Sequence, residues 1–112
     1  MYCANKDVEF EIVNENIKRK ILSHNGKLMT VEVHFKGPTT DPSTHSHPHE
    51  QIAYVVNGRF EFQVKGEKLI LEAGDSIYFE PDVPHGALLL SEEGVLLDIF
   101  TPQREDFLKN KA

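Results

Sequence analysis

The amino-acid sequence predicts an all-β fold, a sandwich or barrel of short strands that ends in a short C-terminal helix. Apolar and polar residues alternate along most of the chain, as they do in strands with one buried face. Turn-forming residues separate these segments about every 8–12 positions, a spacing typical of sandwiches and barrels. Because the chain has 112 residues, we expect one domain that spans residues 1–112.

The first strands are predicted near the N-terminus. Residues 8–13 (VEFEIV) form an apolar segment without an obvious partner, and residues 20–36 form a hairpin. Asn25 and Gly26 supply the positive φ angles that a type I′ turn requires. In the second half of this hairpin, alternation places the apolar side chains on one face: Met29, Val31, Val33 and Phe35.

A second hairpin is expected around Asn57-Gly58, which is again a favourable two-residue turn. The pairs that this turn would create are Val56 with Arg59, Val55 with Phe60, Ala53 with Phe62, and Gln51 with Val64. Directly paired residues lie on the same face of a sheet. Since the face of Val55 and Phe60 is the apolar one, Gln51 is predicted to point into the interior.

The remaining elements follow in chain order. A turn at residues 65–68 returns Leu69 and Leu71 to the inner face, and residues 73–75 (AGD) turn the chain into a strand at 76–81. The last apolar strand covers residues 94–100 (GVLLDIF). In residues 101–110, Thr101 is the expected N-cap of a short helix, with Pro102 at its first helical position.

Composition and charge argue against several classes of partner. Acidic residues outnumber basic ones by 18 to 12, giving a net charge of −6, and the basic residues form no stripe. Nucleic acids and anionic membranes are therefore not expected partners. No apolar run approaches the roughly 18 residues that cross a bilayer, and the N-terminus lacks the features of a signal peptide. With its single cysteine, Cys3, as a free thiol, we expect a cytoplasmic protein.

The most informative residues are His45 and His47, because side chains two positions apart project from the same face of a strand. Such a pair can bind one metal ion, although a polar loop with exposed histidines would have the same sequence. The inward-facing Gln51 and the later His85 favour the metal site, made of three imidazoles and one amide oxygen. A register shifted to His47 and His49 is less favourable because an alanine then occupies the position of the amide ligand.

Two charged residues near the end of the chain also need an explanation. Asp98 interrupts the strand at 94–100, and alternation places it with Leu96 and Phe100 on one face. A carboxylate among apolar side chains is costly unless it is paired or close to a metal. Asp98 is thus either half of a structural salt bridge or a general acid/base facing the cavity. Arg104 is either a solvated surface residue or a clamp for a substrate carboxylate.

These residues resemble the two sequence motifs of the cupin superfamily. Residues 45–51 (HSHPHEQ) with Gly58 are similar to the first motif, in which two histidines and an acid four residues later precede a glycine. Residues 74–85 (GDSIYFEPDVPH) are similar to the second motif, whose histidine is the fourth ligand. The resemblance covers about residues 37–86 and implies a double-stranded β-helix, also called a jelly roll. It also implies a metal site at His45, His47, Gln51 and His85.

One position departs from the cupin pattern, because Gln51 stands where most cupins have a metal-binding glutamate. Three histidines and a glutamine are a neutral set of ligands, so a bound ion would keep its full double charge and act as a stronger Lewis acid. Without an anionic ligand, higher oxidation states are harder to reach. The substitution therefore favours redox-neutral chemistry over oxygen activation.

Among cupins, the first motif combined with Asp98-x-Phe100 and Arg104-Glu-Asp-Phe is similar to the KdgF-type proteins of pectin and alginate breakdown. This resemblance implies an enzyme that converts ring-form 4,5-unsaturated monouronates to their open-chain keto forms. Asp98 would shuttle protons, Phe100 would pack on the sugar, and Arg104 would orient its carboxylate. The alternatives are a metal cupin of another reaction class, such as a dioxygenase or polyketide cyclase, and a non-catalytic module that binds a small anion.

The cofactor and the oligomeric state are predicted less specifically. The ligand set suits one divalent transition metal per chain and is compatible with nickel, zinc, iron, cobalt or manganese. Ile52, Tyr54 and Val56 form an apolar stripe on an outer face, and the strand at 8–13 has no obvious partner. Both surfaces would be covered in a homodimer, which we therefore expect.

Overall fold

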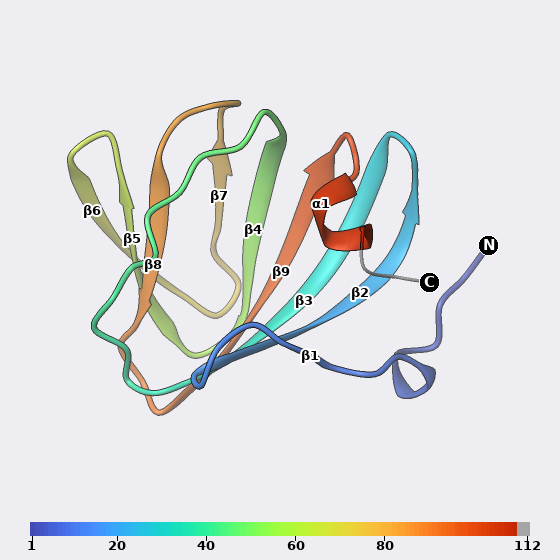
Figure 1. Ribbon diagram of the computed structural model, residues 1–112. Coiled ribbons are helices and arrows are strands. Elements are labelled where there is room, and N and C mark those ends of the chain that lie inside the picture. The colour runs from blue at the N-terminus through green and yellow to red at the C-terminus, as the bar shows by residue number, and fades with distance from the viewer. Residues whose placement is uncertain (110–112) are drawn as a thin grey trace.

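Two antiparallel β-sheets face each other in the computed structural model, which describes residues 1–109 (Figure 1). The larger sheet has the strand order β1-β2-β3-β9-β4-β7 and the smaller one β6-β5-β8. The strands are β1 (Glu11–Ile12), β2 (Ile17–Asn25), β3 (Leu28–Lys36), β4 (Glu50–Asn57), β5 (Arg59–Val64), β6 (Glu67–Glu72), β7 (Ser76–Phe79), β8 (His85–Leu89) and β9 (Glu93–Thr101). A 3-10 helix, η1 (Asn5–Asp7), precedes them and a helix, α1 (Glu105–Leu108), follows. The predicted double-stranded β-helix is thereby confirmed.

The inner faces of the two sheets supply the core. β4 alternates strictly, with Gln51, Ala53 and Val55 buried and their neighbours exposed. The buried cluster between the sheets consists of Phe35, Ala53, Val55, Phe60, Phe62, Phe79, Leu89 and Leu96. A second cluster lies nearer to α1 and contains Ile21, Met29, Val31 and Phe100. The larger sheet thus has one buried face, and its polar inward-facing residues stand out against an apolar background.

The segment between β3 and β4 extends the smaller sheet beside β8, as the green ribbon in Figure 1 shows. His45 and His85 exchange backbone hydrogen bonds of 3.0 and 2.9 Å, and the Ala87 amide donates to the Pro42 carbonyl at 3.0 Å. Gly86 permits this close approach, because a Cβ there would collide with the carbonyl oxygen of Pro42. The pairing brings the histidines of the two motifs together.

The predicted hairpin around Asn57-Gly58 is wrong. β4 pairs with β7 and β9, whereas β5 pairs with β6 and β8, so the chain crosses from one sheet to the other at Gly58. Gly58 has a φ of +90°, and a Cβ there would lie 2.6 Å from the carbonyl oxygen of Glu93. A turn sequence such as Asn57-Gly58 is the same whether the following strand pairs with the preceding one or joins the other sheet. Gln51 points inward nonetheless, since alternation alone determines its side.

The turn of the first hairpin is displaced by one residue from its predicted position. Asn25 pairs with Leu28, which leaves Gly26 and Lys27 as the two turn residues. Of the apolar strand predicted at 8–13, only β1 forms, and it has a partner because it pairs with β2. Leu71 is half-buried as expected, but Leu69 is 36% exposed because β6 lies at a sheet edge.

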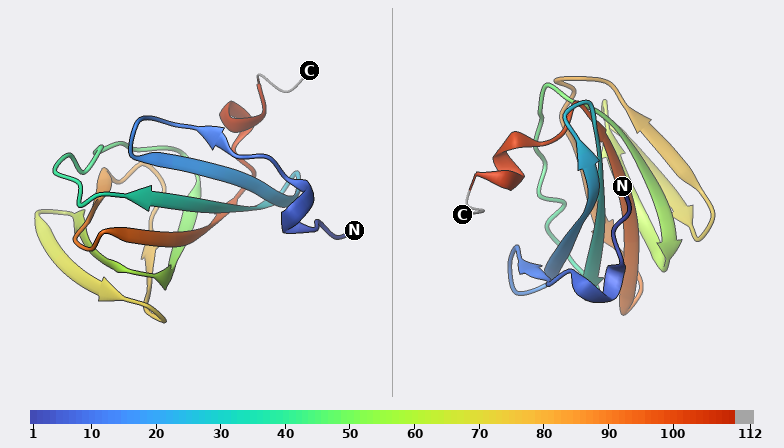
Figure 2. Two further views of the ribbon diagram at one scale, coloured as in Figure 1. Left: turned by 90° about the horizontal axis from the view of Figure 1, so that it is seen from below. Right: turned by 90° about the vertical axis from the view of Figure 1, so that its right-hand side faces the viewer.

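The C-terminal helix forms but starts later than predicted. Thr101 still pairs with Glu50 as the last residue of β9, so it is not an N-cap. Arg104 is the N-cap of α1 instead. Asn110, where the predicted segment ends, lies outside the described residues. In Figure 2 the short helix projects to one side of the two sheets. Within residues 1–109, no helix has the length and apolarity that crossing a membrane requires.

Candidate functional site

Three histidines meet at one end of the space between the sheets. His45 and His47 come from the segment before β4, and His85 begins β8. Their ligand atoms all lie within 4.8 Å of one another. His47 and His85 are buried, at 5% and 3% exposure, whereas His45 is exposed. Phe79 stacks on the His85 ring at 4.0 Å and so supports its orientation. The three imidazoles are therefore close enough to bind one ion.

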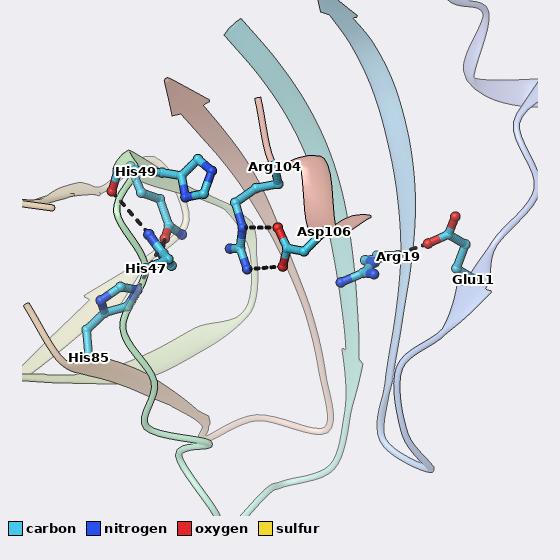
Figure 3. Close-up of polar contacts among 8 residues, drawn as sticks. Glu11, Arg19, His47, His49, His85, Arg104 and Asp106 are labelled. Atoms are coloured by element: carbon cyan, nitrogen blue, oxygen red, sulfur yellow. Dashed lines mark hydrogen bonds and ion pairs between the residues drawn. The ribbon is translucent and has the colours of Figure 1, made fainter. Parts of the chain in front are cut away.

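Each imidazole is oriented by a backbone carbonyl at its Nδ1 atom. The Nδ1 of His45 lies 2.7 Å from the Ser43 oxygen, and that of His85 lies 2.9 Å from the Val83 oxygen. The Nδ1 of His47 lies 3.1 Å from the oxygen of His49, which Figure 3 shows beside it. Carbonyl oxygens only accept hydrogen bonds, so each Nδ1 carries the proton. The Nε2 atoms are then the ones available to a metal, as in many protein metal sites.

Gln51 completes the cluster from β4. Its Oε1 atom lies 3.0 Å from Nε2 of His47 and 3.2 Å from Nε2 of His85. The Gln51 side chain also hydrogen-bonds to Asp98. Because a carboxylate accepts, the amide nitrogen faces Asp98 and the amide oxygen faces the imidazoles. The four predicted ligand residues are thus brought together by the fold.

The chemistry of these atoms fits a bound cation. Burial is the largest effect on both buried histidines: it lowers the pKa of His47, and it lowers the pKa of His85 to about 4. Both rings are then neutral near pH 7, and their Nε2 lone pairs point at the lone pairs of the Gln51 oxygen. Three acceptors that converge without a proton repel one another unless a cation lies between them. Imidazole nitrogen and amide oxygen are suitable ligands for a divalent transition metal.

Asp98 lies next to this cluster and faces the interior. Its partners across the sheet are Val31 and Ala53, both fully buried. Its Oδ1 atom is buried without a hydrogen-bond partner among the described residues. Burial raises the pKa of Asp98 to about 7, while the hydrogen bond from Gln51 and the charge of Arg104 act in the opposite direction. No ion pair to Asp98 forms within residues 1–109, so Asp98 has no salt-bridge partner among these residues.

Phe100 and Arg104 lie close to the histidines as well. The Phe100 ring meets the His47 ring edge to face at 5.7 Å. The guanidinium of Arg104 lies over Phe100, with 5.1 Å between its Cζ and the ring centroid. Figure 3 shows that Arg104 also makes two hydrogen bonds to Asp106, of 3.0 and 2.8 Å. Arg104 is therefore not a solvated surface residue. Two nitrogens of its guanidinium already bind the carboxylate of Asp106.

A cavity of about 270 Å³ connects these groups. Its lining includes His45, Gln51, His85, Asp98, Phe100 and Arg104. The cavity walls also include Arg19 and Phe107, which are not among the site residues predicted from the sequence. Arg19 could have been found in the way Asp98 was found, because it alternates with Ile17 and Ile21 on the inner face of β2. Three of the four candidate ligands, the carboxyl group of Asp98 and two guanidiniums thus share one cavity.

The fold and the cluster define a small jelly-roll protein with a candidate metal centre, and comparison with known proteins agrees. The Cupin domain family model matches residues 29–100. The pectin degradation protein KdgF of Dickeya dadantii (strain 3937) is 43% identical over 108 residues, which cover 96% of this chain and 97% of that protein. The chain belongs to the cupin family, and its predicted resemblance to KdgF-type proteins is confirmed.

Solved structures show the same relationship. The structure of KdgF from Halomonas sp. has a TM-score of 0.90 and 36% sequence identity, covering 96% of this chain and 98% of that chain. An RmlC-like cupin from Shewanella frigidimarina NCIMB 400 has a TM-score of 0.83 and 37% identity, covering 95% and 94%. The polyketide cyclase RemF from Streptomyces resistomycificus, at 19% identity and a TM-score of 0.78, shares the fold.

Proposed function

We propose that this protein is a metal-dependent enzyme that converts 4,5-unsaturated monouronates from the ring form to the open-chain keto form in pectin or alginate breakdown. The observation that carries the proposal is Asp98, whose pKa is raised by burial to about 7 and which lines the same cavity as three of the four candidate ligands. A group of this kind can both accept and donate a proton at neutral pH. The similarity to pectin degradation protein KdgF supports the substrate class.

The candidate ligands for the cofactor are His45, His47, Gln51 and His85, which would hold one divalent transition metal per chain. A bound ion would supply Lewis acidity that polarises substrate oxygens. The four residues would also fix the position of the sugar relative to Asp98. The isomerisation needs no change of oxidation state, which agrees with a ligand set that contains no carboxylate.

In the proposed reaction Asp98 moves protons in two stages. As the carboxylate, it removes the proton of the anomeric hydroxyl while the bond from the anomeric carbon to the ring oxygen breaks. It returns that proton to the ring oxygen, which leaves an aldehyde and an enol. In the second stage a proton leaves the enol oxygen and another is added to the neighbouring carbon of the double bond. Each stage releases and takes up one proton, so no co-reactant is consumed.

Phe100 and Arg104 would position the sugar for these transfers. The face of an aromatic ring packs well on the apolar side of a sugar ring, and Phe100 lines the cavity next to His47. The guanidinium of Arg104 would hold the carboxylate of the substrate. Two of its nitrogens already donate to Asp106, so the substrate either displaces that carboxylate or uses the remaining N–H groups. Orientation of this kind contributes strongly to rate.

The experiment that tests this proposal follows the loss of ultraviolet absorbance of a 4,5-unsaturated monouronate. Asp98→Asn should retain the metal and the fold but lose about 10²–10⁴-fold in rate, the usual contribution of a positioned acid/base. Asp75→Asn is a suitable control, because Asp75 is exposed and lies outside the cavity lining. Conversion at the spontaneous rate by fully metallated wild-type protein would refute the uronate proposal and favour a binding module or another cupin chemistry.

We further propose a cytoplasmic homodimer formed by one domain. Cys3 is an exposed free thiol, which suits a reducing compartment. The outer face of the larger sheet exposes large apolar side chains on β4 and β7: Ile52, Tyr54, Val56 and Tyr78, each at 41% to 51% exposure. A patch of this kind on a sheet face is typical of a protein interface.

A further inference from the structure

Arg19 is placed on the wall of the cavity by the register of the larger sheet. On β2 it pairs with Glu11 of β1 and with Val33 of β3. Val33 packs against both apolar clusters, so its face of the sheet is the inner one. Paired residues share a face, and Arg19 accordingly belongs to the same cavity lining as Asp98 and His85. β2 and β9 are separated by two strand spacings of about 4.8 Å each, because β3 lies between them. Arg19 is therefore close enough to contact the sugar that Asp98 would act on.

The guanidinium of Arg19 is held in place but keeps free donors. Its Nε lies 3.3 Å from Oε1 of Glu11. Its Cζ lies 3.8 Å from the centroid of the Phe107 ring. Among the described residues, neither of its two Nη atoms takes part in a hydrogen bond. Arg104 differs, because Asp106 occupies both its Nε and its Nη2.

The two guanidiniums converge on one aromatic ring. Arg104 lies 4.2 Å from the Phe107 centroid and Arg19 lies 3.8 Å from it, so their Cζ atoms are separated by at most about 8 Å. In Figure 3, Asp106 is drawn between the guanidinium groups of Arg104 and Arg19. A carboxylate that accepts N–H···O bonds of about 2.8 Å from two guanidiniums can bridge Cζ atoms up to about 8 Å apart. The upper limit on the separation therefore permits a shared anion.

We propose that Arg19 is a substrate-binding residue that forms, together with Arg104, a two-guanidinium site for the carboxylate of the sugar acid. The inference rests on the proposed function and adds a residue from a strand outside both cupin motifs. Arg19 would contribute its free Nη donors, and Phe107 would keep the two cations apart and desolvated on one side. The site would select acidic over neutral sugars.

The test measures ligand affinity in Arg19→Gln, Arg19→Lys and a matched control, Arg59→Gln. Arg59 also pairs with an acidic residue, Glu72 at 3.5 Å, but it lies on β5 outside the cavity lining. Binding of galacturonate, a saturated sugar acid, is compared by calorimetry with binding of neutral galactose to metallated protein. KM and kcat are measured separately for the unsaturated monouronate, and thermal unfolding is recorded for every variant.

Arg19→Gln should weaken galacturonate binding and raise KM by about 10-fold to 100-fold, the range for lost hydrogen bonds to a charged group. It should reduce the preference for galacturonate over galactose, with Arg19→Lys in between and Arg59→Gln unchanged. An unchanged preference, or an equal loss for both sugars together with a lower melting temperature, would overturn the inference and assign Arg19 a structural role. Galacturonate and galactose are not substrates of the proposed reaction. Their binding therefore tests the role of Arg19 even if the protein does not convert the unsaturated monouronate.

Discussion

Removing the ionisable group at Asp98 should change how the stability of the metal-free protein depends on pH. Burial raises the pKa of Asp98 from the ordinary value of 3.8 to about 7 in the folded state. Below pH 4 the carboxyl group is protonated in both the folded and the unfolded chain, so it costs nothing. Above pH 7 it is charged in both states, and the folded protein then bears the cost of a buried charge. Wild-type stability is therefore lost progressively as the pH rises from about 4 to about 7, and the loss is complete above pH 7.

The size of this effect follows from the difference between the two pKa values. About three pH units correspond to about 4 kcal/mol, since one unit is 1.36 kcal/mol. Asp98→Asn has nearly the same shape but no charge. The free energy of unfolding of Asp98→Asn minus that of wild type should accordingly increase by about 4 kcal/mol between pH 4 and pH 8. The variant thus becomes more stable relative to wild type as the pH rises.

Urea unfolding of both metal-free proteins at several pH values measures this difference directly. Titration of the histidines occurs in both proteins and cancels in the comparison. A difference that stays constant from pH 4 to pH 8 would show that Asp98 titrates normally, and it would remove the argument that this residue exchanges protons at neutral pH.

Three further predictions concern the fold and its surfaces. Gly86→Ala should destabilise the protein by about 1–3 kcal/mol in urea unfolding, because its Cβ would collide with the Pro42 carbonyl; unchanged stability would contradict the tight pairing with β8. Light scattering at tens of micromolar should give the mass of a dimer, and a monomer mass would reject the interface proposed on β4 and β7. Asp106→Asn should lower KM for a uronate, because it weakens the internal competitor on Arg104; a higher KM would show that Asp106 orients this guanidinium instead.

Alternation along a strand was the most reliable guide to the site. It predicted the inward side of Gln51 and Asp98 without requiring knowledge of which strands pair. The pairing itself was predicted wrongly at Gly58, because a glycine turn signals a change of direction and does not reveal the sheet to which the next strand belongs. The predicted start of α1 was also wrong. Thr101 and Pro102 are locally suited to a helix N-terminus, but pairing with Glu50 keeps Thr101 in an extended strand.

Residues outside the motifs were harder to predict. Arg19 lies far upstream of His45, and the role proposed for it depends on a cavity that exists only when β2 packs beside β3 and α1. Its position between Ile17 and Ile21 was nevertheless visible as a charge on an apolar face, the same signal that identified Asp98. The hydrogen bonds between Arg104 and Asp106 could not be predicted, because they depend on where a four-residue helix begins.

Metal content tests the central claim, that His45, His47, Gln51 and His85 form one metal site. Wild type and a control, His24→Ala, should each bind about one divalent ion per chain after reconstitution and removal of excess metal, since His24 bonds to Gln103 outside the cluster. His47→Ala and His85→Ala should lose most of that ion, because each removes one of the converging Nε2 atoms. Undiminished occupancy in both variants, measured on folded protein by elemental analysis, would contradict the account.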